Sequence, residues 1–187
     1  MSTETITKKL FSVDEFHRMA EVGILPEEGR FELIRGEIVE MPLAGSSHGG
    51  RVKRIVRAFT SRLGESAIVS VQDALLIDHH SLPMPDVTLL KPRGDFYTDS
   101  HPRPEDVFLV VEVSHTTVWY DTTIKAPLYA AAGIQEYWQL DINKEVLIVR
   151  TDPANGEYRS TRVIQRSETI RPQELPHYTF SLDELLG

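Results

Sequence analysis

The stretch Val107-Phe108-Leu109-Val110-Val111-Glu112-Val113 contains one charged residue in an otherwise apolar run. A run without polar alternation is typical of a central strand that is buried on both faces. An ionised carboxylate in such a strand costs several kcal/mol unless a cation or good hydrogen bonds compensate it. We therefore expect Glu112 to have a partner, and metal ions and lysines are the usual ones.

Two further residues are placed to meet Glu112. Asp86 follows Pro85 and opens a second apolar run at residues 85–90, which predicts another strand, and Lys125 follows Glu112 in a helical pattern. Adjacent strands lie about 4.8 Å apart, so carboxylates on neighbouring strands could share one ion. Carboxylate-held Mg²⁺ can activate water and stabilise the negative charge of a phosphate, and a nearby lysine can assist. The three residues therefore predict a metal-dependent phosphodiesterase site.

Local patterns predict a mixed α/β domain over residues 1–187, in which helices flank a mixed central sheet and extra β-hairpins are added. A capping box at Ser12-Val13-Asp14-Glu15 predicts a short helix that ends near Glu21. Apolar spacing predicts helices at about 46–63 and 122–132, and Ser181 is expected to cap a final short helix. Strands are expected at residues 31–34, 37–41, 67–71, 74–77, 85–90, 106–114, 136–141, 146–151 and 158–164.

Composition limits the classes of protein that fit. A chain of 187 residues with 41% hydrophobic residues suits one globular domain, and the absence of cysteine excludes disulfides and thiolate zinc sites. Residues 1–9 lack the apolar core of a signal peptide, and no stretch approaches the roughly 18 apolar residues of a membrane span. We therefore expect a cytoplasmic protein that does not enter a membrane.

The net charge of −8 argues against a non-specific nucleic-acid binder, which usually has a basic excess. The positive charge is uneven, however, because five basic residues and no acid lie between Gly49 and Leu63. These basic residues lie mostly on the polar side of the predicted helix at 46–63 and are candidates for DNA contact.

The order of these motifs resembles the restriction-endonuclease-like nucleases, the PD-(D/E)XK superfamily. Their signature is Pro-Asp, a spacer, then Asp or Glu, any residue, and Lys. Pro85-Asp86 matches the first part and Glu112-Val113 the second, whereas Ser114 stands where the lysine is usual. One branch carries its lysine on the following helix, and Lys125 fits that version. That branch is the Uma-type endonuclease family, a domain of unknown function that is especially numerous in cyanobacteria.

The resemblance covers roughly residues 10 to 150 in the right order. It includes residues 31–38, His48 at the head of the long helix, residues 110–114, and residues 129–138 after Lys125. It implies a restriction-endonuclease-like core with a Mg²⁺ or Mn²⁺ site and DNA as the substrate. It also implies a homodimer, in which each protomer cuts one strand.

The resemblance and the chemistry together suggest roles for single residues. Asp86 and Glu112 would be the main metal ligands, and the backbone carbonyl of Val113 would add an oxygen. Lys125 would orient or polarise the attacking water, and Glu32 would supply a third carboxylate. Hydrogen-bonding groups at the rim of the site are expected from Gln72 and Ser114. Nucleic-acid contacts are expected from His48, Arg51, Arg54 and Arg57.

Each residue also has a plain structural interpretation. Asp86 could merely begin a strand, and Glu112 could form a structural ion pair with Lys125 or an arginine. Lys125 could be solvated on its helix, and Glu32 could face solvent on its strand. His48 could cap its helix or lie at the surface, and the basic residues that follow could form a solvated helix face. Aromatic side chains expected in or near the core are Trp119, Tyr137 and Trp138.

Two other functions remain open at this point. The acidic charge and the displaced lysine also fit a catalytically weak or inactive nuclease-fold protein that binds nucleic acid or protein partners. A metal-dependent hydrolase of small phosphoesters would use a similar carboxylate cluster.

Overall fold

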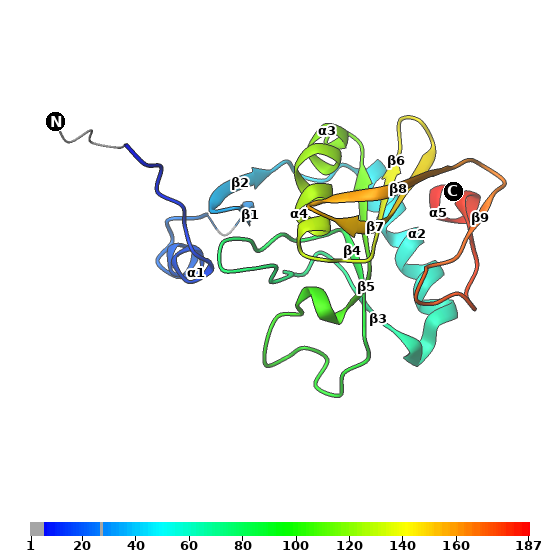
Figure 1. Cartoon of the computed structure of the whole chain (residues 1–187), viewed down its shortest axis with the longest axis horizontal. Helices are drawn as coiled ribbons and strands as arrows, with labels where there is room; N and C mark the ends of the chain where they lie inside the picture. The colour runs from blue at the N-terminus through cyan, green and yellow to red at the C-terminus, as the bar shows by residue number, and fades with distance from the viewer. Residues whose placement is uncertain (1–5, 27) are drawn as a thin grey trace. The chain divides into compact units, whose positions relative to one another are not determined.

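The computed structural model describes residues 6–26 and 28–187, which form two compact units. Unit 1 comprises residues up to Leu43 together with Leu76–Pro83, and unit 2 comprises Ala44–Leu75 and Met84–Gly187. Residues 1–5, part of the amino-terminal stretch that lacks the apolar core of a signal peptide, lie outside the described residues. Figure 1 shows the helices and strands along the chain.

Unit 1 contains a short helix and a two-stranded hairpin. Helix α1 (Val13–Glu21) begins with the expected capping box, in which Ser12 and Glu15 bond each other's backbone N–H. Strands β1 (Arg30–Ile34) and β2 (Glu37–Met41) pair antiparallel. Their turn has φ of 52° at Arg35 and 79° at Gly36, as a two-residue hairpin turn requires. A Cβ at Gly36 would also lie 2.6 Å from the Leu10 Cβ, so only glycine fits there.

Unit 2 is built on a six-stranded mixed sheet with the order β3-β4-β5-β6-β7-β8. Its strands are β3 (Ile68–Ser70), β4 (Val87–Leu90), β5 (Val107–Ser114), β6 (Glu136–Asp141), β7 (Val146–Ala154) and β8 (Glu157–Ile164). Only β5 and β6 pair in parallel, and the other neighbours are antiparallel. A parallel pair needs a long crossover connection, and the helical segment between β5 and β6 provides it.

Helices cover both faces of this sheet (Figure 1). On one face lie α2 (Ser46–Leu63) and α5 (Leu182–Leu186), and on the other lie α3 (Val118–Tyr120), the π-helical turn η3 (Asp121–Lys125) and α4 (Ala126–Ala131). Because side chains alternate along a strand, β5 sends Val111 and Val113 to the α2 side and Glu112 to the η3 side. The apolar run is therefore buried on both faces, as its composition predicts. Short elements complete the fold: η1 (Gly64–Ser66), η2 (Pro104–Asp106), β9 (Thr169–Ile170) and β10 (Phe180–Ser181).

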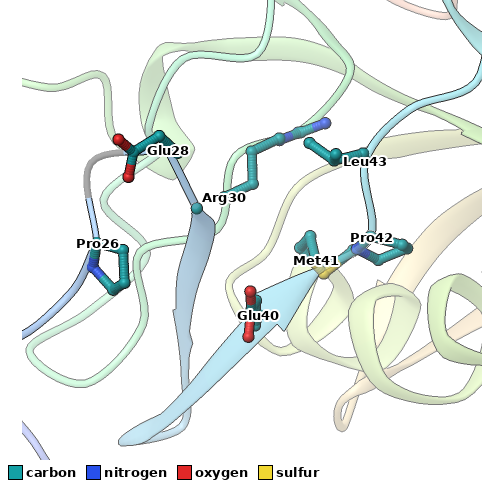
Figure 2. Close-up of a pocket in the computed structure, with 8 residues that line it drawn as sticks. Pro26, Glu28, Arg30, Glu40, Met41, Pro42 and Leu43 are labelled. Atoms are coloured by element: carbon teal, nitrogen blue, oxygen red, sulfur yellow. The ribbon is translucent and has the colours of Figure 1, made fainter.

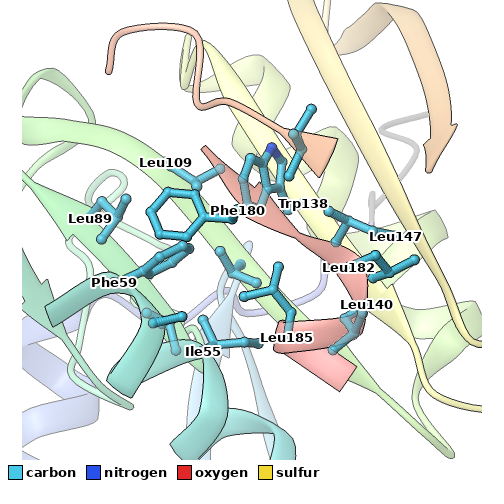
Figure 3. Packing of buried hydrophobic residues seen from close by; sticks show 14 of the residues in the cluster. Ile55, Phe59, Leu89, Leu109, Trp138, Leu140, Leu147, Phe180, Leu182 and Leu185 are labelled. Carbon is cyan, nitrogen blue, oxygen red and sulfur yellow. The ribbon is translucent and has the colours of Figure 1, made fainter. Parts of the chain in front are cut away.

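The main core fills the space between the sheet and the pair α2 and α5 (Figure 3). Phe59 of α2 lies at its centre, with ring centroids 4.8 Å from Phe180 and 6.1 Å from Trp138. The apolar face predicted for the helix at 46–63 is buried, apart from Val56, which is half-buried.

Three details differ from the sequence-based expectations. Residues 74–77 form no strand, because the chain leaves the sheet at Gln72, where φ is 55°. The helix expected from Thr122 begins at Val118, because a π-helical turn breaks the regular spacing on which the prediction depended. Trp119 is 67% exposed instead of packing in the core, whereas Tyr137 and Trp138 are buried.

Among the residues that the structure describes, no helix combines the length and the apolar character that crossing a membrane requires.

The position of Phe59 predicts a large loss of stability on truncation. Phe59→Ala should lower the free energy of unfolding by about 3–5 kcal/mol, because it removes a fully buried ring and leaves a cavity. Thr60→Ala, next to it on the exposed side of α2, should change it by less than about 0.5 kcal/mol. Urea unfolding measures both, and similar losses for the two variants would contradict the proposed core.

Candidate active site

Two buried carboxylates lie side by side where β4 begins. Asp86 immediately precedes β4, which pairs with β5, the strand that carries Glu112. The Asp86 N–H donates to Glu112 Oε2 at 3.4 Å, and the Val113 N–H donates to Asp86 Oδ2 at 2.9 Å. The Asp86 and Glu112 residues are only 5% and 3% exposed. The backbone N–H of Asp86 thus bonds the carboxylate of Glu112, and the backbone N–H next to Glu112 bonds the carboxylate of Asp86.

Lys125 and Tyr129 both donate hydrogen bonds to the same carboxylate oxygen of Glu112. Lys125 Nζ lies 2.9 Å from Glu112 Oε1, and the Tyr129 hydroxyl donates to this oxygen at 2.8 Å. Lys125 is only 1% exposed, so it is not a solvated helix lysine. The partner that a buried Glu112 requires is therefore a lysine, which was one of the two expected kinds.

The π-helical turn places Lys125 on the sheet side of its helix. The wider turn of η3 changes the angular spacing of side chains relative to an α-helix, and such turns are frequent at functional sites. Asp121, Lys125 and Tyr129 follow one another at intervals of four residues, and all three are buried. Pro127 lies in the first turn of α4, where its missing N–H costs little.

Two further side chains hold Asp86. His48 Nε2 lies 2.9 Å from Asp86 Oδ2, and the Gln72 amide donates to Oδ1 at 3.2 Å. Gln72 adopts φ of 55°, an unfavourable conformation for a non-glycine residue, and its N–H bonds the carbonyls of Pro85 and Asp86. Burial alone would raise the pKa of Asp86. The hydrogen bond and charge of His48, with the bonds from Val113 and Gln72, outweigh burial and lower that pKa below its ordinary value.

The site offers oxygen atoms of the kind that Mg²⁺ and Mn²⁺ prefer. The Ser114 carbonyl accepts from the Ile142 N–H, so Ser114 turns its backbone toward β6. Successive residues of a strand turn their backbone groups to opposite edges, so the Val113 carbonyl faces the edge where Asp86 lies. Two carboxylates and this carbonyl are oxygen donors of the chemical type that Mg²⁺ binds, an ion that usually keeps several waters. Across residues 6–26 and 28–187, three or more His, Asp or Glu side chains nowhere gather as a metal cluster.

The remaining predicted residues occupy varied places. Glu32 lies on β1 of unit 1 and is buried, so the solvent-facing interpretation of it is wrong, and its role as a third carboxylate stays a prediction. Ser114 is buried rather than at a rim, because its hydroxyl donates to Asp121 at 2.6 Å. Gln72 does lie at the candidate site, through its bond to Asp86.

The basic residues of α2 have different surroundings. His48 is directed at Asp86 and is neither a helix cap nor a surface residue. Arg51 bonds back to Ser47, and Arg54 lies against Gly187 at the carboxyl terminus. Arg57 is exposed.

Two site residues were missed from the sequence. Tyr129 lies within the stretch 129–138 that carries the resemblance, without a predicted role, and Asp121 lies outside the predicted motifs. Both are four residues from Lys125, so they share its side of a helix, and this spacing is the signal that could have identified them.

Unit 1 has a separate pocket of about 460 Å³ at the ends of its hairpin. Figure 2 shows Glu28, Arg30 and Glu40 among its lining residues. None of the predicted site residues lines this pocket.

Comparisons with known proteins identify the family of the chain and support its fold. The model of the Uma2 family, described as "Putative restriction endonuclease", matches residues 13–183. A crystal structure from Anabaena variabilis, described as "a putative nuclease belonging to DUF820", superposes with a TM-score of 0.70. The two chains are 17% identical, and the match covers 94% of this chain and 97% of the other, so this likeness shows the fold alone. No curated protein matches this chain.

The Glu112–Lys125 pair predicts a coupled effect on stability. Lys125→Met should lower the free energy of unfolding at pH 7 by about 3–5 kcal/mol, because it leaves a buried carboxylate without its cation. Adding Glu112→Gln should recover at least half of this loss, because the uncompensated charge is then gone.

Lys144→Met is the matched control. Its ammonium lies 3.8 Å from Asp141 but is 73% exposed, so the loss should stay below about 1 kcal/mol. Urea unfolding of these three variants and the wild type checks the prediction. A double variant no more stable than Lys125→Met would contradict the pairing.

The low pKa of Asp86 predicts a pH dependence. The unfolded chain has the ordinary pKa of 3.8, so ionised Asp86 stabilises the fold above that pH. This stabilisation is lost as the pH falls from 3.8 through the folded-state value. A ¹³C NMR titration should give a midpoint below 3.8 for the Asp86 carboxyl and a higher midpoint in His48→Ala. The Asp121 carboxyl, whose pKa burial raises, should titrate above 3.8 in the same spectra. An Asp86 midpoint above 3.8 would contradict the prediction.

Proposed function

We propose that this chain, which belongs to the Uma2 family, is a metal-dependent DNA endonuclease that hydrolyses phosphodiester bonds. The observation that carries the proposal is the meeting of Asp86, Glu112 and Lys125 in one buried cluster. They come from the start of β4, from β5 and from a helix, so local structure alone does not bring them together.

Mg²⁺ or Mn²⁺ would be held by the carboxylates of Asp86 and Glu112 and by the Val113 carbonyl. Such an ion supplies an activated water and stabilises the negative charge that develops on the phosphate. The remaining tasks belong to the side chains of the protein.

Lys125 supplies a positive charge beside the carboxylates. Its ammonium is held at Glu112 Oε1 in a water-poor setting, where electrostatic effects are stronger than in solvent. From there it would orient the attacking water or stabilise the transition state. Tyr129 bonds the same oxygen, so Glu112 Oε2 is directed toward Asp86.

His48 and Gln72 position Asp86. Together with the Val113 N–H they bond both of its carboxylate oxygens. The resulting low pKa keeps Asp86 ionised at neutral pH, as a cation ligand must be.

DNA contacts are proposed for α2. His48 lies at the site, and the side chains of Arg51, Arg54 and Arg57 follow it along the helix. At 1.5 Å per residue, Arg57 lies about 13 Å beyond His48 along the helix axis, a span suited to more than one phosphate. A homodimer that cuts both strands is proposed by analogy with nucleases of this fold.

A second candidate is a nuclease-fold protein that binds nucleic acid without cutting it. It is favoured by the hydrogen bonds of the site, because each carboxylate oxygen of Asp86 and Glu112 already accepts from a protein donor. Such a site is satisfied without a metal ion. Salt-sensitive DNA binding should then persist in EDTA, and Arg57→Glu should weaken it.

Cleavage of supercoiled plasmid tests the two candidates. With Mg²⁺ or Mn²⁺ the wild type should nick the plasmid, and EDTA should stop it. Asp86→Ala should lower the rate by at least about 100-fold, because a metal ligand is lost. Asp73→Ala, an exposed acid in the same part of the chain, should cleave like the wild type.

The outcomes separate the candidates clearly. Cleavage that survives in Asp86→Ala would refute the proposed site. Metal-independent DNA binding without nicking would favour the second candidate.

A further inference from the structure

A third buried carboxylate, that of Asp121, links the two elements that carry Glu112 and Lys125. Asp121 is 2% exposed, and its Oδ2 accepts hydrogen bonds from the hydroxyls of Ser114 and Thr117, both at 2.6 Å. Ser114 lies two residues after Glu112 on β5, and Asp121 lies four residues before Lys125. One carboxylate therefore ties the start of the lysine-bearing helix to the end of the glutamate-bearing strand.

Gln139 of β6 also connects the start of the helix to the sheet by hydrogen bonds. Its amide nitrogen donates to the Ser114 hydroxyl at 3.0 Å and to the Val118 carbonyl at 3.1 Å. Its amide oxygen accepts from Thr122 at 3.0 Å and from Arg150 at 3.0 Å. Gln139 is fully buried, so these bonds satisfy an amide that would otherwise be costly. The start of the helix is thus attached to both strands of the parallel pair.

These hydrogen bonds fix the start of the helical segment whose Lys125 side chain contacts Glu112. A lysine on a helix can meet a strand carboxylate only if the helix has a fixed height and rotation over the sheet. Ser114 occupies the strand position of the usual lysine, and its short side chain supplies a hydroxyl to Asp121 instead. The displaced lysine and the serine are therefore two parts of one arrangement.

We propose that Asp121 is a positioning residue for Lys125, which anchors the start of the helix so that the ammonium meets Glu112. The consequence for catalysis rests on the proposed endonuclease function, whereas the consequence for Lys125 does not.

A simple helix cap would not need this arrangement. Thr117 already stands at the N-cap position of α3, and a solvent-exposed acid could favour the first turn at little cost. Asp121 is instead buried, which raises its pKa, while the charge of Lys125 and the hydroxyls of Ser114 and Thr117 lower it. Burying a carboxylate between helix and sheet costs more free energy than placing an acid in solvent at the helix start. Here the buried carboxylate of Asp121 also fixes the position of the helix relative to β5.

Two substitutions of Asp121 separate anchoring from charge. Asp121→Asn keeps one oxygen that can accept from both hydroxyls, so kcat for DNA cleavage should stay within about threefold of wild type. Asp121→Ala removes the anchor, and kcat should fall by roughly 10- to 100-fold with KM within about threefold. In a Lys125→Ala background, Asp121→Ala should cause no further loss, because both changes act through the same ammonium. Equal losses for Asn and Ala, or additive losses in the double variant, would overturn the proposal.

NMR of the lysine ammonium groups supplies a readout that does not need cleavage. The ¹⁵Nζ signal of Lys125, identified by its absence in Lys125→Met, should be visible because the group is buried and hydrogen-bonded. It should persist in Asp121→Asn and should shift or disappear in Asp121→Ala. An unchanged signal in Asp121→Ala would overturn the proposal whether or not the protein cleaves DNA. A wild type that cuts no substrate would refute the endonuclease function alone.

Glu136→Ala is the matched control for a change that only destabilises the fold. Glu136 is also a buried carboxylate, but it lies at the other end of β6 and bonds Trp138 and Gln173. This variant should lower the midpoint of urea unfolding and leave both the Lys125 signal and kcat unchanged. Loss of the Lys125 signal in Glu136→Ala would show that general destabilisation explains the effect of Asp121→Ala.

Discussion

The buried ion pair between Glu112 and Lys125 is the interaction on which the rest of unit 2 depends. A carboxylate in the middle of a central strand is tolerated only because a cation and the Tyr129 hydroxyl meet it at one oxygen. That requirement places the crossover helix over this face of the sheet. It also explains why the start of the helix is fastened to the strands through Asp121 and Ser114. The carboxylate of Asp86 accepts a hydrogen bond from the Val113 N–H on β5, the strand that carries Glu112.

Much of the fold could be predicted because its signals are local. The capping box at Ser12, the apolar face of the helix at 46–63 and the apolar run at 107–113 each lie within a few turns or one strand. The start of the helix before Lys125 could not be predicted in this way. A π-helical turn disturbs the regular spacing, and the bonds that hold Val118 and Asp121 come from β5 and β6.

The candidate site was predictable to a similar extent. The burial of Glu112 required a partner, the patterns of the neighbouring segments suggested Asp86 and Lys125, and the resemblance to a nuclease family supported both. The contact between His48 and Asp86 was not predictable, because it depends on how α2 and β4 approach each other in space. The prediction for Trp119 was wrong because its hydrophobicity suggested burial, whereas the side chain is 67% exposed on α3.

The parallel pairing of β5 and β6 has a consequence for the order of folding. Parallel strands cannot join through a tight turn, so these two can pair only when the connection between them crosses over the sheet. Glu112, Asp121, Lys125, Tyr129 and Gln139 all lie within this strand–helix–strand segment. The pairing of opposite charges and the closing of the central sheet are therefore expected to occur in one cooperative step. Chains that reach the native sheet would thus acquire the assembled site at the same moment.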